Sequence, residues 1–315
     1  MAFRSGFVSI IGRPNAGKST LLNALVGEKL AIVTHKPQTT RNRIQGFVNV
    51  APQKGRPAGQ IIFIDTPGIH KPDTPLNKRM MREVHDALES RDLVLLIVDV
   101  TQKFGAGDRF SLDLLKKTGG PAFLLLNKID LVAKEKLLPI IAEWSRQHDF
   151  KEIIPISAAK RDGLELLLDK VIGNLPEGPR YFPKDQLTDQ PERFLAAEIV
   201  REKVLFDTAE EVPYATTVIV ERWEEEPKLT RIAATVYVER EGQKKIIVGR
   251  RGEMIKRIGT EARQEIERLL GTRVFLELFV KVRPNWRESR QFLEELDWRK
   301  QLEGLQEAGG RRQED

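Results

Sequence analysis

The chain has 315 residues, 40% hydrophobic and 31% charged, which is the composition of a folded globular protein and excludes a disordered one. This length predicts about two domains, each large enough to form its own core. The net charge of +6 permits an anionic partner, nucleic acid or lipid, without identifying one. The absence of cysteine excludes disulfides, zinc–thiolate sites and cysteine nucleophiles.

No apolar run approaches the roughly 18 residues that a membrane-spanning helix needs. The first residues, MAFRSGFVSIIG, hold too short an apolar part, interrupted too soon by glycine, for a signal peptide. The sequence therefore predicts a cytoplasmic protein.

Residues 1–178 alternate short apolar runs with longer amphipathic segments. The apolar runs are typical of strands buried on both faces of a parallel sheet, and they are FVSII, IIFI, LVLLIV, AFLLL and IIPI. Helical patterns lie between them, at 18–26, 76–90, 107–118, 134–147 and 162–175. This alternation predicts an α/β domain with a doubly wound, mostly parallel sheet.

The first motif, GRPNAGKST, begins directly after the first apolar run and matches G-x-x-x-x-G-K-[ST]. Its glycines let backbone N–H groups face phosphate oxygens, Lys18 can reach the β- and γ-phosphates, and the Ser19 hydroxyl can bind Mg²⁺. A glycine-rich turn is the plain alternative, and the preceding strand and following helix argue against it. The predicted nucleotide-binding residues here are Gly12, Pro14, Asn15, Ala16, Gly17, Lys18, Ser19 and Thr20.

Two later motifs indicate which base is bound. In NKID, the Asp130 carboxylate can accept hydrogen bonds from N1–H and the 2-amino group of guanine, which adenine lacks. Asn127 can hold the base edge and its loop, and Lys128 can lie over the ring. The segment SAAKRDG supplies Ser157 and Ala158, whose N–H can donate to the guanine O6. By itself, a helix-capping aspartate or a polar turn explains NKID equally well.

The order of the motifs along the chain favours one shared site. Each of them, DTPG at 65–68 included, follows an apolar run, and ligands of open α/β sheets collect at the carboxyl ends of the strands. One guanine nucleotide can therefore touch all four segments. With these motifs, the first half of the chain resembles a translation-factor-class P-loop GTPase.

This resemblance implies roles for further residues. Asp65 would hold Mg²⁺ through water, the Gly68 N–H would sense the γ-phosphate, and a switch threonine would reach both. The segment HKPQTTRNR offers Thr39 and Thr40; we favour Thr40, although the sequence does not separate them and an ordinary polar loop is the alternative. The predicted metal ligands are Ser19, Thr40 and Asp65, and the predicted catalytic groups are Lys18, Thr40 and Gly68.

Ile69 stands where Ras-like GTPases place the glutamine that orients water. One explanation is that switch backbone groups and a second polar residue order the water, with slow intrinsic hydrolysis that a partner accelerates. The other is that a monovalent cation, K⁺, completes the site, because Asn15 resembles the asparagine of potassium-activated GTPases. The alternative role for Asn15 is to shape the loop.

The pattern changes after residue 178. Prolines and polar turn clusters predict a linker at 179–191, followed by a small α+β domain at 192–290 and a charged tail at 291–315. In this domain, an amphipathic helix at 192–206 precedes two alternating strands around the turn EPK, and another alternating strand runs from 273 to 283.

Between these strands, IIVGRRGEMIKRIG carries a G-x-x-G tetrad flanked by helical patterns. In KH domains such a tetrad clamps the backbone of single-stranded nucleic acid, whereas a simple helix–turn–helix is the alternative. Residues 240–257 hold seven Lys or Arg against two Glu, and the element order resembles the type II KH arrangement. The predicted RNA-binding residues are Gly249, Arg250, Arg251, Gly252 and Lys256.

A GTPase domain, this linker and a C-terminal KH domain together resemble the Era family of bacterial ribosome-assembly GTPases. The resemblance covers roughly residues 4–290 and includes GRPNAGKST, PQTTR, DTPGIH, NKID, SAA and IIVGRRGEMIKRIG. It implies a monomeric GTPase using GTP, GDP and Mg²⁺. It also implies binding near the 3′ end of small-subunit ribosomal RNA, action in 30S subunit assembly, and peripheral association with the inner face of the cell membrane. The family usually places Lys beside a Gly of the tetrad; here both middle residues are Arg, which keeps the charge and changes the hydrogen-bond geometry.

The leading hypothesis is a switch in which GTP occupancy biases the KH domain through segments 33–43 and 65–78. Two alternatives remain open. One alternative is an RNA-binding assembly factor whose nucleotide site is largely structural, and Ile69 favours it. The other is a GTPase switch at the membrane surface, and the basic face favours it.

Overall fold

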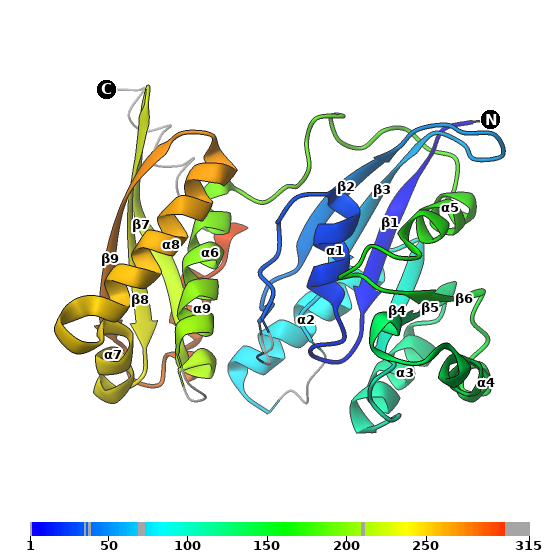
Figure 1. The fold of residues 1–315 in the computed structure, drawn as a ribbon, viewed down its shortest axis with the longest axis horizontal. Coiled ribbons are helices and arrows are strands. Elements are labelled where there is room, and N and C mark those ends of the chain that lie inside the picture. Colours follow the sequence, from blue (N-terminus) through cyan, green and yellow to red (C-terminus); the bar gives the residue numbers. More distant parts are fainter. Residues whose placement is uncertain (1, 35, 37–38, 69–72, 209–211, 300–315) are drawn as a thin grey trace. The chain divides into compact units, whose positions relative to one another are not determined.

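The computed structural model describes residues 2–34, 36, 39–68, 73–208 and 212–299 (Figure 1). Ile69 and the last part of the tail, from residue 300, lie outside these ranges. The chain forms two compact units, which are described separately. The first holds Met1–Lys71 and Arg79–Asp189, and the second holds Pro72–Lys78 and Gln190–Asp315.

A six-stranded sheet with the order β2-β3-β1-β4-β5-β6 forms the centre of the first unit. Its five parallel strands come from the five predicted apolar runs: β1 (Arg4–Ile11), β3 (Gly59–Asp65), β4 (Leu93–Asp99), β5 (Ala122–Asn127) and β6 (Glu152–Ile156). The edge strand β2 (Ile44–Val50) pairs antiparallel with β3 and was not predicted. The mostly parallel sheet is therefore confirmed, with one antiparallel strand added.

Helices cover both faces of this sheet. One core cluster joins α1 (Lys18–Val26) and α5 (Leu164–Asn174) to the sheet. A second cluster lies on the other face and joins the remaining helices, which are α2 (Pro75–Glu89), α3 (Ala106–Thr118) and α4 (Leu137–Ser145). These bounds agree with the predicted helices to within a few residues, because each helix presents one apolar stripe to a continuous strand surface.

The segment predicted as a linker lies along the edge of this sheet. The Phe47 N–H of β2 donates to the Leu187 carbonyl (2.8 Å), and the Phe47 ring stacks on Phe182 with centroids 3.8 Å apart. The buried Gln60 side chain accepts from the N–H groups of Tyr181 (2.9 Å) and Phe182 (3.0 Å). These contacts hold the segment on the edge of the first sheet from Tyr181 to Leu187.

The second unit contains a three-stranded sheet with the order β7-β8-β9. Strands β7 and β8 are antiparallel, and β8 and β9 are parallel. The helices α6 and α8 lie side by side against this sheet (Figure 1). The element order is α6 (Glu192–Asp207), β7 (Thr217–Glu226), β8 (Leu229–Val238), α7 (Glu241–Val248), α8 (Glu253–Leu270), β9 (Arg273–Val282) and α9 (Arg290–Glu295). This is the predicted order, and it confirms the α+β type II KH fold.

The end of the KH fold is anchored by a tryptophan. Trp286 is fully buried, its Nε1–H donates to the Ala215 carbonyl (2.8 Å), and its ring contacts Phe292 of α9 edge to face. The start of the predicted tail therefore packs on the KH domain. Among the described residues, none of the helices combines the length and apolar composition needed to span a lipid bilayer.

Candidate functional site

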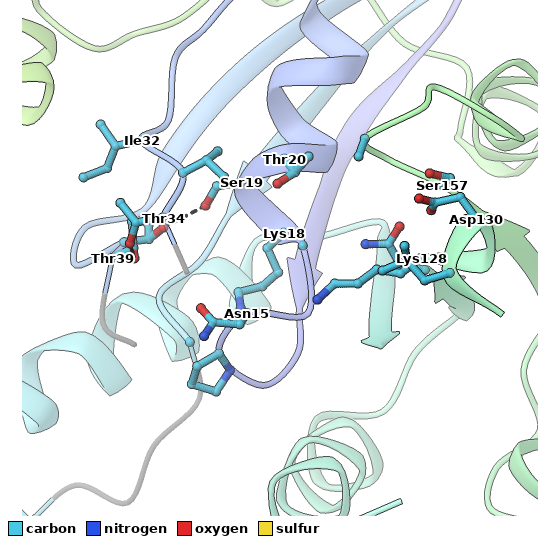
Figure 2. A pocket seen from close by; sticks show the side chains of 18 residues that line it. Asn15, Lys18, Ser19, Thr20, Ile32, Thr34, Thr39, Lys128, Asp130 and Ser157 are labelled. Atoms are coloured by element: carbon cyan, nitrogen blue, oxygen red, sulfur yellow. Dashed lines mark hydrogen bonds between the residues drawn. The ribbon is translucent and has the colours of Figure 1, made fainter. Parts of the chain in front are cut away.

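A pocket of about 380 Å³ lies at the carboxyl edge of the first sheet, and all four predicted motifs line it. Figure 2 shows Asp130 and Ser157 at one end, Ser19 and Thr39 at the other, and Lys18 between them. The predicted residues that line the pocket are Pro14, Asn15, Gly17, Lys18, Ser19, Thr20, Thr40, Gly68, Asn127, Lys128, Asp130 and Ser157.

Four other residues of the predicted nucleotide site are buried and do not line the pocket. They are Gly12, Ala16, Asp65 and Ala158. Further lining residues were not among the predicted site residues, and they are Ile32, Val33, Thr34, Leu131 and Ala159. Val33 and Thr34 lie in the predicted switch segment 33–43, and Ala159 lies in SAAKRDG. Of these, Ala159 follows a predicted residue directly, and position was the signal that pointed to it.

Two glycines of the phosphate loop allow close approach of neighbouring groups. A Cβ atom on Gly12 (φ 156°) would lie 2.4 Å from the Ile97 carbonyl oxygen. On Gly17 (φ 105°) it would lie 2.2 Å from the Asn127 amide nitrogen. Asn15 also adopts a left-handed conformation (φ 62°), which asparagine tolerates better than most residues and which is compatible with a loop-shaping role.

Lys18 is buried at the base of the loop. Its Nζ donates to the carbonyl oxygens of Gly12 (3.1 Å) and Arg13 (3.0 Å). Burial lowers its pKa to about 8, although the charge of Asp65 opposes this shift. Lys18 therefore remains mostly protonated at neutral pH and is held by weak acceptors that phosphate oxygens can replace.

Three oxygen-bearing side chains gather beside Lys18. The Ser19 hydroxyl donates to Asp65 Oδ2 (2.6 Å) and lies 2.8 Å from the Thr40 hydroxyl oxygen. Asp65 Oδ1 is buried and has no hydrogen-bond partner among the residues that the structure describes. Two hydroxyls and a carboxylate with a free oxygen suit Mg²⁺, which prefers oxygen ligands.

Electrostatics at this cluster support a cation. Burial raises the pKa of Asp65 to about 6, against the opposing effects of the Lys18 charge and the Ser19 hydrogen bond. Thr39 lies outside the cluster, because its hydroxyl donates to the Lys36 carbonyl (2.6 Å) and is 2.7 Å from that of Thr34. The contacts favour Thr40 as the switch threonine, as predicted, and its role stays a prediction.

Asn127 connects three segments at the base-binding end. Its Nδ2 donates to the Ala16 carbonyl (2.8 Å), and its Oδ1 accepts from the Ala158 N–H (3.0 Å). The expected Ala158 contact to the guanine O6 stays a prediction, and Ala159 rather than Ala158 lines the pocket.

Asp99 is a site residue that the sequence analysis missed. Its Oδ2 accepts from Lys128 Nζ (2.7 Å), and its Oδ1 accepts from the Thr101 N–H and hydroxyl. Burial raises the pKa of Asp99, but the hydrogen bonds from Lys128 and Thr101 outweigh it and hold the pKa below its usual value. The signal that would have found Asp99 is an acid at the end of the apolar run LVLLIVD.

The second site is the G-x-x-G turn between α7 and α8. Gly249 (φ 71°) and Gly252 (φ 82°) are left-handed, and a Cβ on Gly249 would lie 2.5 Å from Met254 Cβ. Three cations at the turn are exposed and make no ion pair within the described part of the chain: Arg250, Arg251 and Lys256. Ile246, 45% exposed, stands beside this turn, whereas Ile247 and Ile258 are in the core.

The fold and the pocket define a P-loop GTPase joined to a KH domain. A family model described as 50S ribosome-binding GTPase matches residues 7–128, and a KH domain model matches residues 211–287. The GTPase Era of Syntrophus aciditrophicus (strain SB) is 51% identical over 298 residues, covering 94% of this chain and 95% of that protein. This chain belongs to the Era family of GTPases.

Two solved Era structures match nearly the whole chain at 40% identity. A variant of Aquifex aeolicus Era bound to GDP·AlF4⁻ superposes with a TM-score of 0.88, covering 92% of this chain and 98% of that one. Era in complex with MgGDPNP and nucleotides 1506–1542 of 16S ribosomal RNA superposes with a TM-score of 0.89, covering 93% and 98%.

Replacing Asp65 by asparagine tests the buried carboxylate in the nucleotide-free protein. Because its pKa rises from 3.8 to about 6 on folding, the folded state binds the proton more tightly. The contribution to stability is therefore present near pH 4 and lost as the pH rises to about 6. We expect Asp65→Asn to raise the free energy of unfolding by up to about 3 kcal/mol at pH 8, and by little near pH 4. Urea unfolding at both pH values measures this, and an equal difference at both would contradict it.

Replacing Asp130 by asparagine tests base recognition. The amide cannot accept from both N1–H and the 2-amino group of guanine, so we expect GTP affinity to fall by roughly 10²–10⁴-fold. Xanthosine triphosphate carries an oxygen at position 2 that can accept from the amide, and it should bind the variant more tightly than the unsubstituted protein. Competition against fluorescent GDP measures both affinities. Asp162→Asn, an exposed acid in the adjacent loop, is the matched control and should change neither.

Proposed function

We propose that this protein is a GTP-hydrolysing switch that binds small-subunit ribosomal RNA near its 3′ end through the KH domain and acts in 30S subunit assembly. The observation that carries the proposal is the pocket at which four motifs meet, with Ser19, Thr40 and Asp65 gathered beside Lys18. The related Era structure with MgGDPNP and nucleotides 1506–1542 of 16S ribosomal RNA supports the choice of ligand and partner.

In phosphoryl transfer the protein mainly positions groups and neutralises charge. Lys18 exchanges the carbonyls of Gly12 and Arg13 for the β- and γ-phosphates of GTP. Ser19, Thr40 and Asp65 are the residues that would hold Mg²⁺, which would supply positive charge beside the phosphates when bound. Gly68 lines the pocket and packs against Pro14 of the phosphate loop, where a Cβ would be 2.9 Å from the proline Cγ, and its N–H is the group that we propose senses the γ-phosphate.

The competing function, an RNA-binding factor whose nucleotide site is only structural, predicts no hydrolysis. Single-turnover GTP hydrolysis with and without the ribosomal RNA fragment separates the two. We expect a slow intrinsic rate that the RNA or the 30S subunit accelerates.

We propose a cytoplasmic location from the sequence, and a monomeric state and peripheral contact with the inner face of the cell membrane from the family resemblance. Flotation with anionic liposomes at low and high salt tests the membrane contact, because electrostatic attachment weakens as salt rises.

A test of K⁺ separates the two roles of Asn15. If K⁺ completes the site, GTP hydrolysis should be roughly tenfold or more faster in KCl than in NaCl of equal ionic strength, part of the 10³–10⁵ that an arginine finger supplies. Glycine accepts the φ of 62° at this position, so Asn15→Gly keeps the loop and removes the side chain. We expect this variant to lose the difference between the salts. Equal hydrolysis rates of the unsubstituted protein in both salts would rule out the K⁺ hypothesis. A rate difference that persists in Asn15→Gly would show that the Asn15 side chain does not hold the cation and would favour the loop-shaping role.

Removing the two arginines of the tetrad tests the RNA site. Arg250→Gln with Arg251→Gln should weaken binding of the 3′-terminal ribosomal RNA fragment by roughly 10–100-fold and flatten the salt dependence by about 0.7 per lost phosphate contact. The matched control is Arg268→Gln with Arg273→Gln, which removes two exposed charges near the other end of α8. Fluorescence anisotropy across a salt series measures both. Equal losses in the two double variants would remove the KH groove as the binding site.

A further inference from the structure

A salt bridge ties the phosphate loop to the start of α3. Arg13 Nη1 lies 3.2 Å from Asp108 Oδ2, and the two side chains are only 18% and 4% exposed. Neither residue belongs to the groups that line the nucleotide pocket. The pair therefore contacts the phosphate loop from outside the nucleotide pocket.

Asp108 performs two tasks with one oxygen. Its Oδ2 also accepts from the Gly105 N–H (3.0 Å), which caps the first turn of α3. A Cβ on Gly107 would lie 3.4 Å from Arg13 Cβ, so the first turn of the helix packs closely on the loop residue. The side chain of Arg13 is held both by charge and by contact.

Burial makes this pair stronger than an exposed one. A buried carboxylate that loses its cation is left uncompensated, and breaking such a pair is far more costly than breaking a surface pair. Here Arg13 is the cation, and its position is thereby coupled to α3. This coupling matters because Arg13 also carries one of the two carbonyls that hold Lys18.

Among the residues that the structure describes, side chains from outside the loop hold it at both ends. At its far end, Asn127 holds the Ala16 carbonyl, and at its near end, Asp108 holds the Arg13 side chain. The residues between include Asn15 in a left-handed conformation. Attachment at both ends fixes the direction of the intervening N–H groups, on which charge stabilisation in the transition state depends.

We propose that Asp108 is a positioning residue for GTP hydrolysis, acting through Arg13 on the phosphate loop and on Lys18. The proposal rests on the proposed GTPase function. Misplacement of catalytic groups by about 1 Å can cost roughly 10²-fold in rate. Loosening of one attachment should therefore lower kcat more than it lowers affinity for GDP, whose binding uses the same groups without a transition state.

The test is a double-mutant cycle of Asp108→Asn and Arg13→Gln. Asparagine keeps an oxygen for the Gly105 N–H and removes the charge, and Arg13→Gln leaves the helix cap intact if Asp108→Asn fails to fold. Asp113→Asn, an exposed acid on the same helix, is the matched control. The kcat and KM for GTP, the Kd for GDP and the melting temperature are measured for each protein.

We expect each single variant to lose roughly tenfold in kcat, with a smaller change in the Kd for GDP, and the double variant to be no slower than either. The control should match the unsubstituted protein. Multiplicative losses in the double variant, or equal changes in kcat and in the Kd for GDP, would overturn the positioning role. Absence of hydrolysis in the unsubstituted protein would instead contradict the proposed function, so the two failures are distinguishable.

Discussion

The nucleotide pocket depends on one side-chain amide, that of Asn127. Its nitrogen donates to the Ala16 carbonyl of the phosphate loop and its oxygen accepts from the Ala158 N–H. An aspartate here would place a negative charge against the carbonyl, and a leucine would leave both backbone groups unpaired. The missing side chain of Gly17 follows from the same contact, because a Cβ there would lie 2.2 Å from the amide. A residue that looks like a base-reading group therefore also holds the loops together.

Strand register brings the partners of Asn127 within reach. In the parallel sheet, Asn127 at the end of β5 stands beside Asp99 of β4 and Ile156 of β6. The next residues of each strand leave the sheet at the same edge, so Lys128 meets Asp99 and the segment after Ile156 meets Asn127. The arrangement explains why motifs separated by more than a hundred residues form one site, and why the strands that precede these motifs must be parallel.

The parts of this fold that were predictable from sequence are those in which one physical signal dominates. Strands buried on both faces read as continuous apolar runs, but the edge strand β2 is interrupted by Gln45, Gly46 and Asn49 and was missed. Thr39 and Thr40 are chemically equal, and only the backbone path turns one toward Ser19. Asp99 and Asp108 act on other side chains rather than on the nucleotide, so no motif marks them.

The edge strand that sequence failed to show also binds the segment of chain that leads into the second unit. β2 begins at Ile44, shortly after Thr40 enters the cluster with Ser19. The Thr188 hydroxyl donates to the Gln45 carbonyl (2.6 Å), close to the Phe47 contact with the same segment. A displacement of the switch that moves β2 must therefore move residues 187–188 or break these bonds. Since the second unit begins at Gln190, the chain is held on the edge of the first sheet up to two residues before that unit.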